Sequence, residues 1–359
     1  MINLDDLKVY KKLDTGQVAK SIELLADQVR QVLEESRLIK IPTDYSKVTQ
    51  VVVNGMGGSN IGVHIVKSVF ADQIKVPITI MPGYEVPASV DKKTLYLISS
   101  YSGTTEEPLS VYREVKKRGA KIMAITMDSP KSKLAKLMLK ENIPGYIFKP
   151  QFNPSNQPRL GLGYSIFGVA VLLAKAGLFK IEVRRIEEII ASLGIWDREL
   201  RPLINTVNNR AKQLAIKLYG KQPVLVAAEF LEGNTHALRN QLCESSKNFA
   251  SYLVLPDLNH FALESLANPA GNKNNLTFFF FDSIFYRPRI LKRARLTKQI
   301  VKKNKIPLIA YQLTGLSKLE QAFEMLQLGS WVSYYLGILN QVDPAKIPWV
   351  EWFKRQLSS

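Results

Sequence analysis

Two strand-to-turn transitions constrain the fold of this 359-residue chain more than any other feature of its sequence. The first is the apolar run Val51-Val52-Val53, which continues into Asn54-Gly55-Met56-Gly57-Gly58-Ser59-Asn60. The second is Leu95-Tyr96-Leu97-Ile98, which continues into Ser99-Ser100-Tyr101-Ser102-Gly103-Thr104-Thr105. Each run is typical of a buried strand, ends in small, hydroxyl-rich residues and passes into a helical pattern. This order of elements predicts a parallel α/β sheet.

Both turns have the composition of an anion-binding site. At a helix start the first amide groups lack intrahelical partners, glycine lets an anion approach closely, and hydroxyl groups add donors. Neither the dinucleotide fingerprint nor a P-loop fits the spacing Gly55-x-Gly57-Gly58, so NAD and ATP are not indicated. A single glycine-rich turn after a strand is as often a structural connection as a binding site. A structural helix cap needs only one hydroxyl group. The second turn carries five, on Ser99, Ser100, Ser102, Thr104 and Thr105. We therefore expect the two turns to bind one phosphorylated ligand.

Length and charge limit the classes of protein that the chain can represent. A chain of 359 residues exceeds what one core usually organises, so two globular units are expected. The net charge of +18 is spread along the sequence, with residues 287–305 as its densest part, and no nucleic-acid-binding motif is visible. A basic surface also attracts anionic metabolites. We expect no nucleic-acid partner.

Membrane and disulfide chemistry are not indicated either. The longest apolar segment, 276–281, is far shorter than the roughly 20 residues needed to span a bilayer, so we expect no membrane partner. The N-terminus has neither the basic head nor the apolar stretch of a secretory signal. A single cysteine, Cys243, excludes an intrachain disulfide and a cysteine-based zinc site. These features predict a cytoplasmic protein.

Alternating patterns along the chain predict two similar α/β units. In the first unit strands are expected at 51–54, 78–81, 95–99, 122–126 and 146–148, with helices at 61–71, 106–118, 131–140 and 165–178. Connecting helices at 181–219 are interrupted near Arg201-Pro202. The second unit has strands at 224–228, 252–255, 277–281 and 308–312, with helices at 235–250 and 289–303. The chain ends with a helix at 329–340, the turn Val342-Asp343-Pro344 and a short helix that carries Trp349 and Lys354.

These patterns set the expected domain limits. We expect an N-terminal helical segment at 1–44, a first α/β domain at 45–195, a second at 196–328 and C-terminal helices at 329–359. Ligands of such sheets bind beyond the carboxyl ends of the strands, where both hydroxyl-rich turns are expected. The second domain lacks a glycine loop of the first kind.

Several dispersed motifs resemble one known family. Gly55-Met56-Gly57-Gly58-Ser59 and Ser100-Tyr101-Ser102-Gly103-Thr104-Thr105-Glu106-Glu107 resemble the sugar isomerase (SIS) domain. The later segments 241–247, 256–260, Asp343-Pro344 and Phe353-Lys354 resemble the bifunctional phosphoglucose/phosphomannose isomerases, in the same order over residues 45–359. The resemblance implies two SIS-type doubly wound units with mostly parallel sheets flanked by helices, the second unit reduced, plus N- and C-terminal helices.

The resemblance also implies roles for single residues. The sugar phosphate would be held by Gly58, Ser59, Ser100, Ser102 and Thr105. Four residues would act in catalysis: Arg159 in the active site, Glu244 as the base, His260 in ring opening and Lys354 at the substrate oxygens. The family's histidine comes from the other subunit, which implies a homodimer with a shared active site. The substrate would be a hexose 6-phosphate, converted between aldose and ketose through an enediol without a metal or redox cofactor.

The chain departs from the family pattern at three places, and its residues also have structural interpretations. It has Phe261-Ala262 after the histidine where the family has Asn-Glu, Cys243 where the family has Asn, and Thr104 where the family has Asn. Without the resemblance, Glu244 could pair with Lys247 at the surface. His260 could cap or fill a loop, Lys354 could be a surface lysine on a packing helix, and Arg159 could cap a helix. His64 and His236 are expected to be structural. Two alternatives therefore stay open: a non-catalytic sugar-phosphate sensor and an amino-sugar phosphate isomerase.

Overall fold

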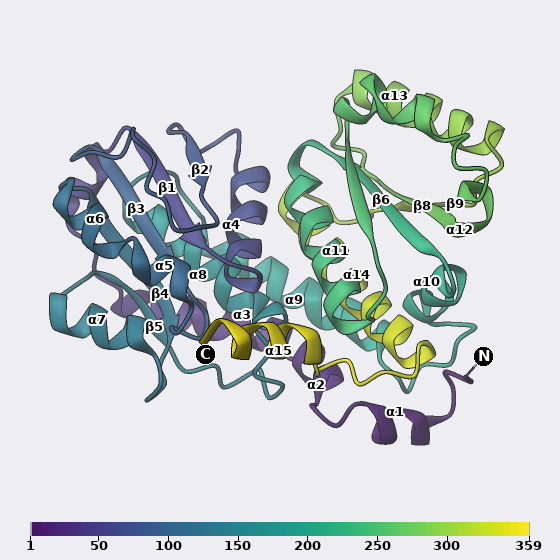
Figure 1. Ribbon diagram of the computed structural model, residues 1–359, viewed down its shortest axis with the longest axis horizontal. Coiled ribbons are helices and arrows are strands. Elements are labelled where there is room, and N and C mark those ends of the chain that lie inside the picture. The colour runs from purple at the N-terminus through teal and green to yellow at the C-terminus, as the bar shows by residue number, and fades with distance from the viewer. Residues whose placement is uncertain (1, 359) are drawn as a thin grey trace. The chain divides into compact units, whose positions relative to one another are not determined.

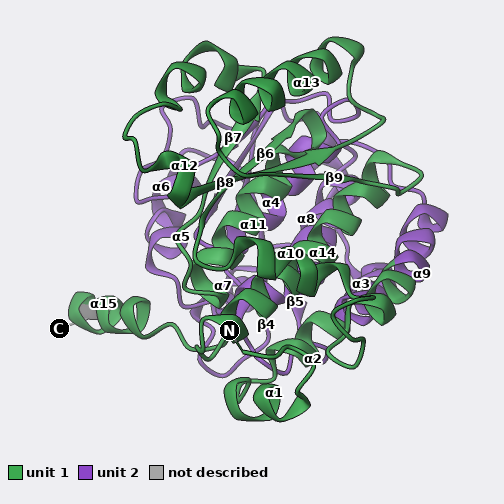
Figure 2. Cartoon of the chain, turned by 90° about the vertical axis from the view of Figure 1, so that its right-hand side faces the viewer, with its two compact units in different colours: residues 1–23, 193–359 green, residues 24–192 purple. Residues whose placement is uncertain are grey.

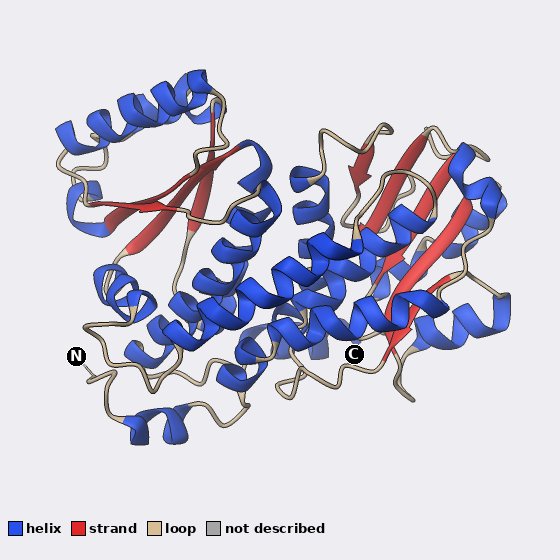
Figure 3. Cartoon of the chain, turned by 180° about the vertical axis from the view of Figure 1, so that it is seen from behind, coloured by secondary structure: helices blue, strands red, loops and turns tan. Residues whose placement is uncertain are grey.

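The computed structural model describes residues 2–358, which form two compact units, each with its own sheet (Figure 1). Unit 1 combines residues 1–23 with residues 193–359, and unit 2 consists of residues 24–192 (Figure 2). In each unit, helices flank a twisted sheet (Figure 3). Among the described residues, none of the helices is both long and apolar enough to cross a membrane.

Unit 2 is built on a five-stranded, wholly parallel sheet with the strand order β2-β1-β3-β4-β5. The strands are β1 (Gln50–Gly55), β2 (Ile78–Ile80), β3 (Thr94–Ser99), β4 (Lys121–Met127) and β5 (Gly145–Phe148). The helices are α3 (Leu25–Glu35), α4 (Gly58–Val69), α5 (Glu106–Ser110), α6 (Tyr112–Lys117), α7 (Lys133–Glu141) and α8 (Leu162–Lys175). Short 3₁₀ turns are η1 (Ser36–Leu38), η2 (Thr43–Lys47) and η3 (Pro158–Leu160). Unit 2 contains the first α/β unit expected from the sequence, and each strand predicted there is confirmed.

Continuous burial of the central strands explains why their sequences do not alternate. Every residue of β3 is buried, as is every residue of β1 after Gln50, because helices cover both faces of the sheet. On one face Val52, Tyr96 and Ile98 pack against Val115 of α6 and Leu134 of α7. On the other face, α4 approaches α8 closely. A Cβ on Gly62 would lie 2.5 Å from the carbonyl oxygen of Ser165, so only glycine permits this packing.

Unit 1 repeats this plan with one strand fewer. Its parallel sheet has the order β7-β6-β8-β9, which matches β2-β1-β3-β4 of unit 2. The strands are β6 (Gln222–Ala228), β7 (Ser251–Leu255), β8 (Leu276–Asp282) and β9 (Leu308–Gln312). The helices are α1 (Leu7–Leu13), α2 (Val18–Glu23), α10 (Arg210–Leu218), α11 (Glu232–Ser245), α12 (Asn272–Asn275), α13 (Pro288–Lys303), α14 (Lys318–Leu339) and α15 (Pro348–Ser358), with η4 (Glu229–Leu231), η5 (Asp257–His260) and η6 (Ala262–Ser265). Unit 1 contains the second α/β unit expected from the sequence, and its sheet is the smaller of the two. The predicted fold class is therefore confirmed.

The two compact units divide the chain at 23/24 and 192/193, whereas the sequence led us to expect domain limits at 44/45, 195/196 and 328/329. The N-terminal segment is divided, because α1 and α2 belong to unit 1 and α3 belongs to unit 2. The reason lies in α3, where the Gln28 amide donates to the carbonyls of Phe152 and Leu160 at 3.0 and 2.9 Å. The long helix α9 (Val183–Leu200) contains the limit between the units at 192/193.

Helix α14 begins eleven residues before the predicted start at 329, since it runs from Lys318. Ser317 caps it by accepting a hydrogen bond from Glu320 N at 3.1 Å, and the Glu320 carboxylate accepts from Leu316 N at 2.8 Å. This capping arrangement fixes the start. Gly329, which looked like a boundary, lies inside the helix where a Cβ would be 2.9 Å from Leu238 Cδ1 of α11. The glycine therefore serves close packing.

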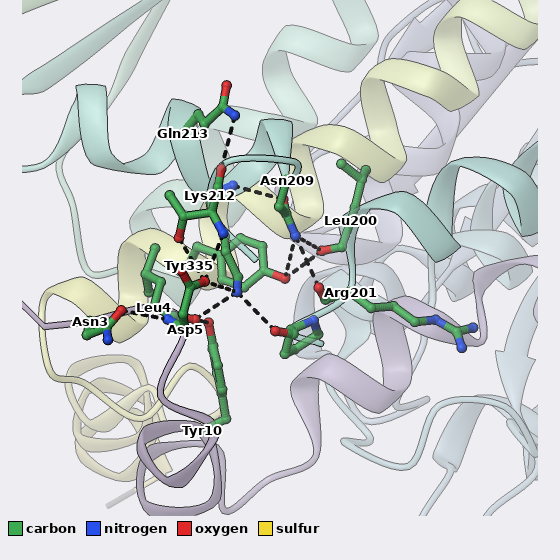
Figure 4. Close-up of polar contacts among 12 residues, drawn as sticks. Asn3, Leu4, Asp5, Tyr10, Leu200, Arg201, Asn209, Lys212, Gln213 and Tyr335 are labelled. Carbon is green, nitrogen blue, oxygen red and sulfur yellow. Dashed lines mark hydrogen bonds and ion pairs between the residues drawn. The ribbon is translucent and has the colours of Figure 1, made fainter. Parts of the chain in front are cut away.

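A fully buried lysine attaches the N-terminal segment to unit 1 (Figure 4). Lys212 Nζ donates to the carbonyls of Leu4 and Pro202 at 2.7 and 2.9 Å and pairs with Asp5 at 3.0 Å. The ammonium group also lies 5.8 Å from the ring centre of Tyr10. Burial lowers the pKa of Lys212, and the hydrogen bond with Asp5 opposes that shift. The N-terminal segment is thus held by polar bonds inside the protein.

We expect Lys212→Met to destabilise unit 1 strongly. The substitution preserves most of the side-chain volume but leaves the buried Leu4 carbonyl and the partly buried Pro202 carbonyl without their donor. Loss of a hydrogen bond to a buried group costs about 1–3 kcal/mol. Urea unfolding followed by tryptophan fluorescence should show a loss of about 3 kcal/mol. The control is Lys20→Met, which removes an exposed ion pair with Glu23 and should cost less than about 1 kcal/mol. Equal losses in the two variants would contradict the role given to Lys212.

Candidate active site

The two hydroxyl-rich turns of unit 2 meet at one edge of its sheet. Gly55, at the end of β1, is the direct partner of Ser99 at the end of β3. Ser99 Oγ donates to the carbonyl of Ser59 at 2.9 Å, and Tyr101 N donates to Ser59 Oγ at 2.7 Å. The turns are therefore bonded to each other, as the parallel order of their strands predicts. Ser59 Oγ accepts the Tyr101 bond, and its own hydroxyl proton can be donated to a ligand.

The start of α4 is tighter than expected for an anion site made of free amides. Gly57 adopts φ +50, and the amides of Ser59 and Asn60 donate to the carbonyls of Met56 and Gly57 at 3.1 and 3.0 Å. These two amides are thus already engaged in the first turn. The side-chain hydroxyl groups of this edge are consequently more available to an anion than these two amides are.

Hydroxyl groups in the second turn differ in what they can offer a ligand. Ser100 is completely buried; its Oγ donates to Thr105 Oγ1 at 2.9 Å and accepts from Gly103 N at 3.1 Å. Ser102 and Thr104 share a hydrogen bond of 3.0 Å near the surface. Thr105 accepts from Ser100, so its own proton can be directed outward. The turn thus has an inner serine that shapes it and outer hydroxyl groups at the surface.

Arg159 lies on the segment that packs against the glycine loop. It belongs to η3, is 1% exposed, and its Nη1 donates to Gln157 Oε1 at 2.8 Å. A Cβ on Gly58 would lie 2.8 Å from the carbonyl carbon of Pro158 and 2.9 Å from Arg159 N. A cation just before α8 opposes the helix dipole, so the structural alternative of a helix cap is not favoured. The structure thus places the backbone of Arg159 against the first turn.

Tyr101 and Asn153 hold this edge together, and neither is among the site residues expected from the sequence. Asn153 Nδ2 donates to the Tyr101 hydroxyl at 2.8 Å and to the Gln157 carbonyl at 3.0 Å. The Tyr101 ring occupies the space beside Gly161, where a Cβ would lie 2.3 Å from Tyr101 Cε2. Burial raises the pKa of Tyr101 to about 12, so its hydroxyl stays protonated. An aromatic residue between two serines was the available signal.

We expect Gly58→Ala to damage this edge, because the added methyl group would meet backbone atoms of the Arg159 segment that cannot rotate away. Overpacking of this kind costs about 1–3 kcal/mol. Urea unfolding should show that loss, and the thermal stabilisation by inorganic phosphate should decrease. The control is Gly194→Ala in α9, where the nearest atom is 4.0 Å away and alanine should stabilise the helix by up to about 1 kcal/mol. An unchanged phosphate response in Gly58→Ala would contradict this geometry.

The equivalent strand ends of unit 1 carry carboxylates instead of hydroxyl groups. Glu229 follows β6 with φ +49, accepts from Arg287 N at 3.3 Å and pairs with the Arg287 side chain at 3.6 Å. Asp282 ends β8 and pairs with Lys298. Negative side chains disfavour phosphate at these positions. Of the two sheets, the one in unit 2 therefore has the strand ends better suited to a phosphate group.

Glu244 lies in the last turn of α11 and is half-buried. Two glycines of α14 bring that helix close: a Cβ on Gly337 would lie 2.7 Å from the Ser245 carbonyl oxygen, and Gly329 faces Leu238. Ser333 Oγ also donates to the Gln241 carbonyl at 2.7 Å. The carboxylate is thus carried by a helix that is held firmly along one side.

His260 is exposed at the end of η5. The preceding Asn259 anchors this turn to α13, since its amide donates to Thr297 Oγ1 at 2.8 Å and its Oδ1 accepts from Arg293 at 3.1 Å. Phe261, one of the departures from the family pattern, is 56% exposed. The asparagine fixes the backbone of the turn, and the imidazole faces outward.

Lys354 lies on α15, whose side chains from 348 to 357 are all exposed. The helix stands away from the other elements of unit 1 (Figure 2). It carries large apolar side chains, with Trp349 81% and Phe353 56% exposed. Lys354 and His260 are thus both exposed, whereas Glu244 is half-buried. The other two histidines lie in helices: His64 is part of α4, and His236 lies 5.8 Å from the ring centre of Tyr252.

Solved structures share the fold of this chain. A hypothetical protein from Thermus thermophilus matches with a TM-score of 0.75 at 15% identity, covering 98% of this chain and 92% of that chain. A glucosamine-6-phosphate deaminase from Thermotoga maritima matches with a TM-score of 0.62 at 16% identity, covering 92% and 97%. At this identity the likeness shows the fold alone: two α/β units, each with a parallel sheet.

Sequence relatives define the family. The family model for the bacterial phospho-glucose isomerase C-terminal SIS domain matches residues 207–357. The bifunctional phosphoglucose/phosphomannose isomerase of Caldicellulosiruptor bescii is 31% identical over 94% of this chain and 98% of that protein. The protein of the same name from Aquifex aeolicus is 28% identical over 88% and 93%. The chain therefore belongs to the bifunctional phosphoglucose/phosphomannose isomerase family, which confirms the resemblance that its motifs indicated.

Proposed function

We propose that this protein interconverts glucose 6-phosphate and mannose 6-phosphate with fructose 6-phosphate through a cis-enediol. One observation carries the proposal: the glycine loop, the hydroxyl turn and the Arg159 segment converge on one edge of the unit 2 sheet. We assign phosphate binding to Gly58, Ser59, Ser102 and Thr105, with Ser100 acting through its hydrogen bond to Thr105. The family to which the chain belongs supports this reaction.

In the proposed mechanism, Glu244 removes a proton from the carbon next to the carbonyl group and returns it one carbon along. This proton transfer is general base catalysis, worth about a hundred- to ten-thousandfold in rate. Glucose and mannose 6-phosphates differ at C2, which is planar in their shared enediol. One carboxylate can therefore serve both epimers.

Three other residues complete the proposed mechanism. His260 opens the sugar ring by moving the proton of the anomeric hydroxyl group to the ring oxygen as the bond between the anomeric carbon and that oxygen breaks, and its imidazole is exposed. Arg159 and Lys354 provide positive charge for the enediolate oxygen. The reaction uses no metal or redox cofactor, since only protons move within one substrate.

The test is to incubate the purified protein with fructose 6-phosphate in D₂O and follow the products by NMR. Formation of both glucose and mannose 6-phosphates, with deuterium at C2, is the expected result. A sensor would bind fructose 6-phosphate, seen as a thermal shift, but would form neither product. An amino-sugar isomerase would convert glucosamine 6-phosphate faster than either hexose. Neither alternative has a structural feature that favours it over the isomerase.

We also propose a homodimer with a shared active site, in which His260 comes from the other subunit. The exposed apolar side chains of α15 support it, because patches of this kind mark interaction sites. The test mixes the inactive variants Glu244→Gln and His260→Ala. If each site uses residues of two subunits, heterodimers regain activity at one of their two sites; if not, mixing restores nothing.

The proposed location is the cytoplasm, in keeping with a single cysteine.

A further inference from the structure

The chain just after Glu244 is held by the segment that follows α14. Helix α11 ends at Ser245, and the chain turns at Lys247, which adopts φ +52. The Asn340 amide donates to the Ser246 carbonyl at 2.9 Å, and Lys247 Nζ donates to the Asp343 carbonyl at 2.6 Å. A positive φ at a non-glycine residue persists only where its surroundings enforce it. The hydrogen bonds from Asn340 and to Asp343 hold Lys247 in this conformation.

Asp343 owes its own conformation to three partners. Its Oδ1 accepts from Ala345 N at 2.9 Å, its Oδ2 accepts from Thr15 Oγ1 at 2.6 Å, and Lys346 lies 3.6 Å away. Burial raises the pKa of this carboxyl, but the hydrogen bonds outweigh it and leave the pKa of Asp343 below its usual value. The carboxylate side chain is 14% exposed. Asp343 is therefore a charged, nearly enclosed centre of a turn.

The N-terminal segment closes over this turn. Gly16 packs so tightly there that a Cβ on it would lie 2.3 Å from Ala345 Cβ. Thr15 is the only residue of this segment whose side chain bonds to Asp343 among the interactions described for residues 2–358. The turn thus joins three parts of unit 1 that are distant in sequence: residues 15–16, the end of α11 and the start of the chain leading to α15.

We propose that Asp343 is a positioning residue for the isomerase reaction. The Asp343 carboxylate stabilises the turn, and the Asp343 carbonyl in that turn accepts a hydrogen bond from Lys247 Nζ. The turn therefore fixes the end of α11, the helix that carries Glu244. The same turn sets where the chain departs toward α15 and Lys354. This inference rests on the proposed function, because it assigns the turn to the placement of the proposed base.

The test measures kcat and KM for fructose 6-phosphate in Asp343→Asn, Thr15→Val and Lys247→Met. Misplacing a catalytic group by about 1 Å can cost a hundredfold, so we expect kcat to fall about tenfold to a hundredfold while KM changes less than about twofold. Lys247→Arg and Thr15→Ser retain the donors and should restore most of kcat. The control is Asp44→Asn, which removes a surface pair with Lys121 in unit 2 and should leave both constants unchanged.

Hydrogen exchange separates this proposal from the proposed function. The amides of 242–248 and 348–357 should exchange faster in Asp343→Asn than in the wild type, whereas those of 94–99 should not change. If the wild type forms no product from fructose 6-phosphate, the proposed function fails. If the amides of 242–248 exchange at the same rate in Asp343→Asn as in the wild type, the positioning role of Asp343 is overturned, whatever the activity. A fall in thermal stability with kcat unchanged, or a kcat that Lys247→Arg does not restore, would show that Asp343 only stabilises the fold.

Discussion

Replacing Glu244 with glutamine should reduce kcat for fructose 6-phosphate by about a hundred- to ten-thousandfold, because the amide cannot accept the proton that the carboxylate removes. The side chain keeps its size, so the end of α11 should retain its structure. Binding of the phosphate group should be unchanged, since the proposed phosphate-binding residues lie on unit 2. Steady-state kinetics gives kcat, and titration calorimetry with fructose 6-phosphate gives the affinity.

Glu232→Gln is the matched control for this experiment. Glu232 is the exposed first residue of the same helix, and the substitution is chemically identical. Its loss costs only the favourable interaction with the helix dipole, less than about 1 kcal/mol of stability. A Glu244→Gln protein that isomerises at the parent rate would show that another group is the base.

Arg159→Met should have the second largest effect, a fall in kcat/KM of about a hundred- to a thousandfold, which is the typical result of removing one donor to a developing negative charge. Arg159→Lys should recover only part of it, because an ammonium group lacks the planar array of donors of a guanidinium. Circular dichroism and urea unfolding show whether the buried site tolerates methionine.

Arg118→Met supplies the comparison for Arg159. Arg118 bonds to the Pro87 carbonyl at 2.6 Å and to Glu114 at 2.8 Å, on the opposite end of the β3–β4 connection from the hydroxyl turn. Its replacement should change stability modestly and kcat/KM little. If Arg159→Met loses stability but keeps the kcat/KM of the folded fraction, Arg159 only supports the glycine loop.

Strand positions were predictable because parallel strands covered on both faces are continuous apolar runs, and their ends are marked by glycine and hydroxyl residues. All nine predicted strands are confirmed to within two residues at each end. The motifs were also sufficient to predict the family, which the relatives confirm. The individual roles of Glu244, His260, Lys354 and Arg159 stay predictions, because they depend on a substrate.

Other features required the folded chain. The division of the N-terminal segment depends on Gln28 bonding to unit 2 and Lys212 bonding to Leu4, contacts more than a hundred residues apart in sequence. The early start of α14 was open to detection through Ser317 and Glu320, but Gly329 obscured it. A glycine in the sequence does not reveal whether it ends a helix or allows two helices to approach.

By itself, the sequence determined the two α/β units, the position of both hydroxyl turns and the family, because strand burial and turn chemistry are local properties of the chain. Only the tertiary structure decided that Ser100 is an inner residue of its turn, that Tyr101 and Asn153 link the glycine loop to the Arg159 segment, and that Asp343 joins the end of α11 to the N-terminal segment. These arrangements depend on hydrogen bonds between residues that are far apart in sequence, whose partners are set by how the elements pack.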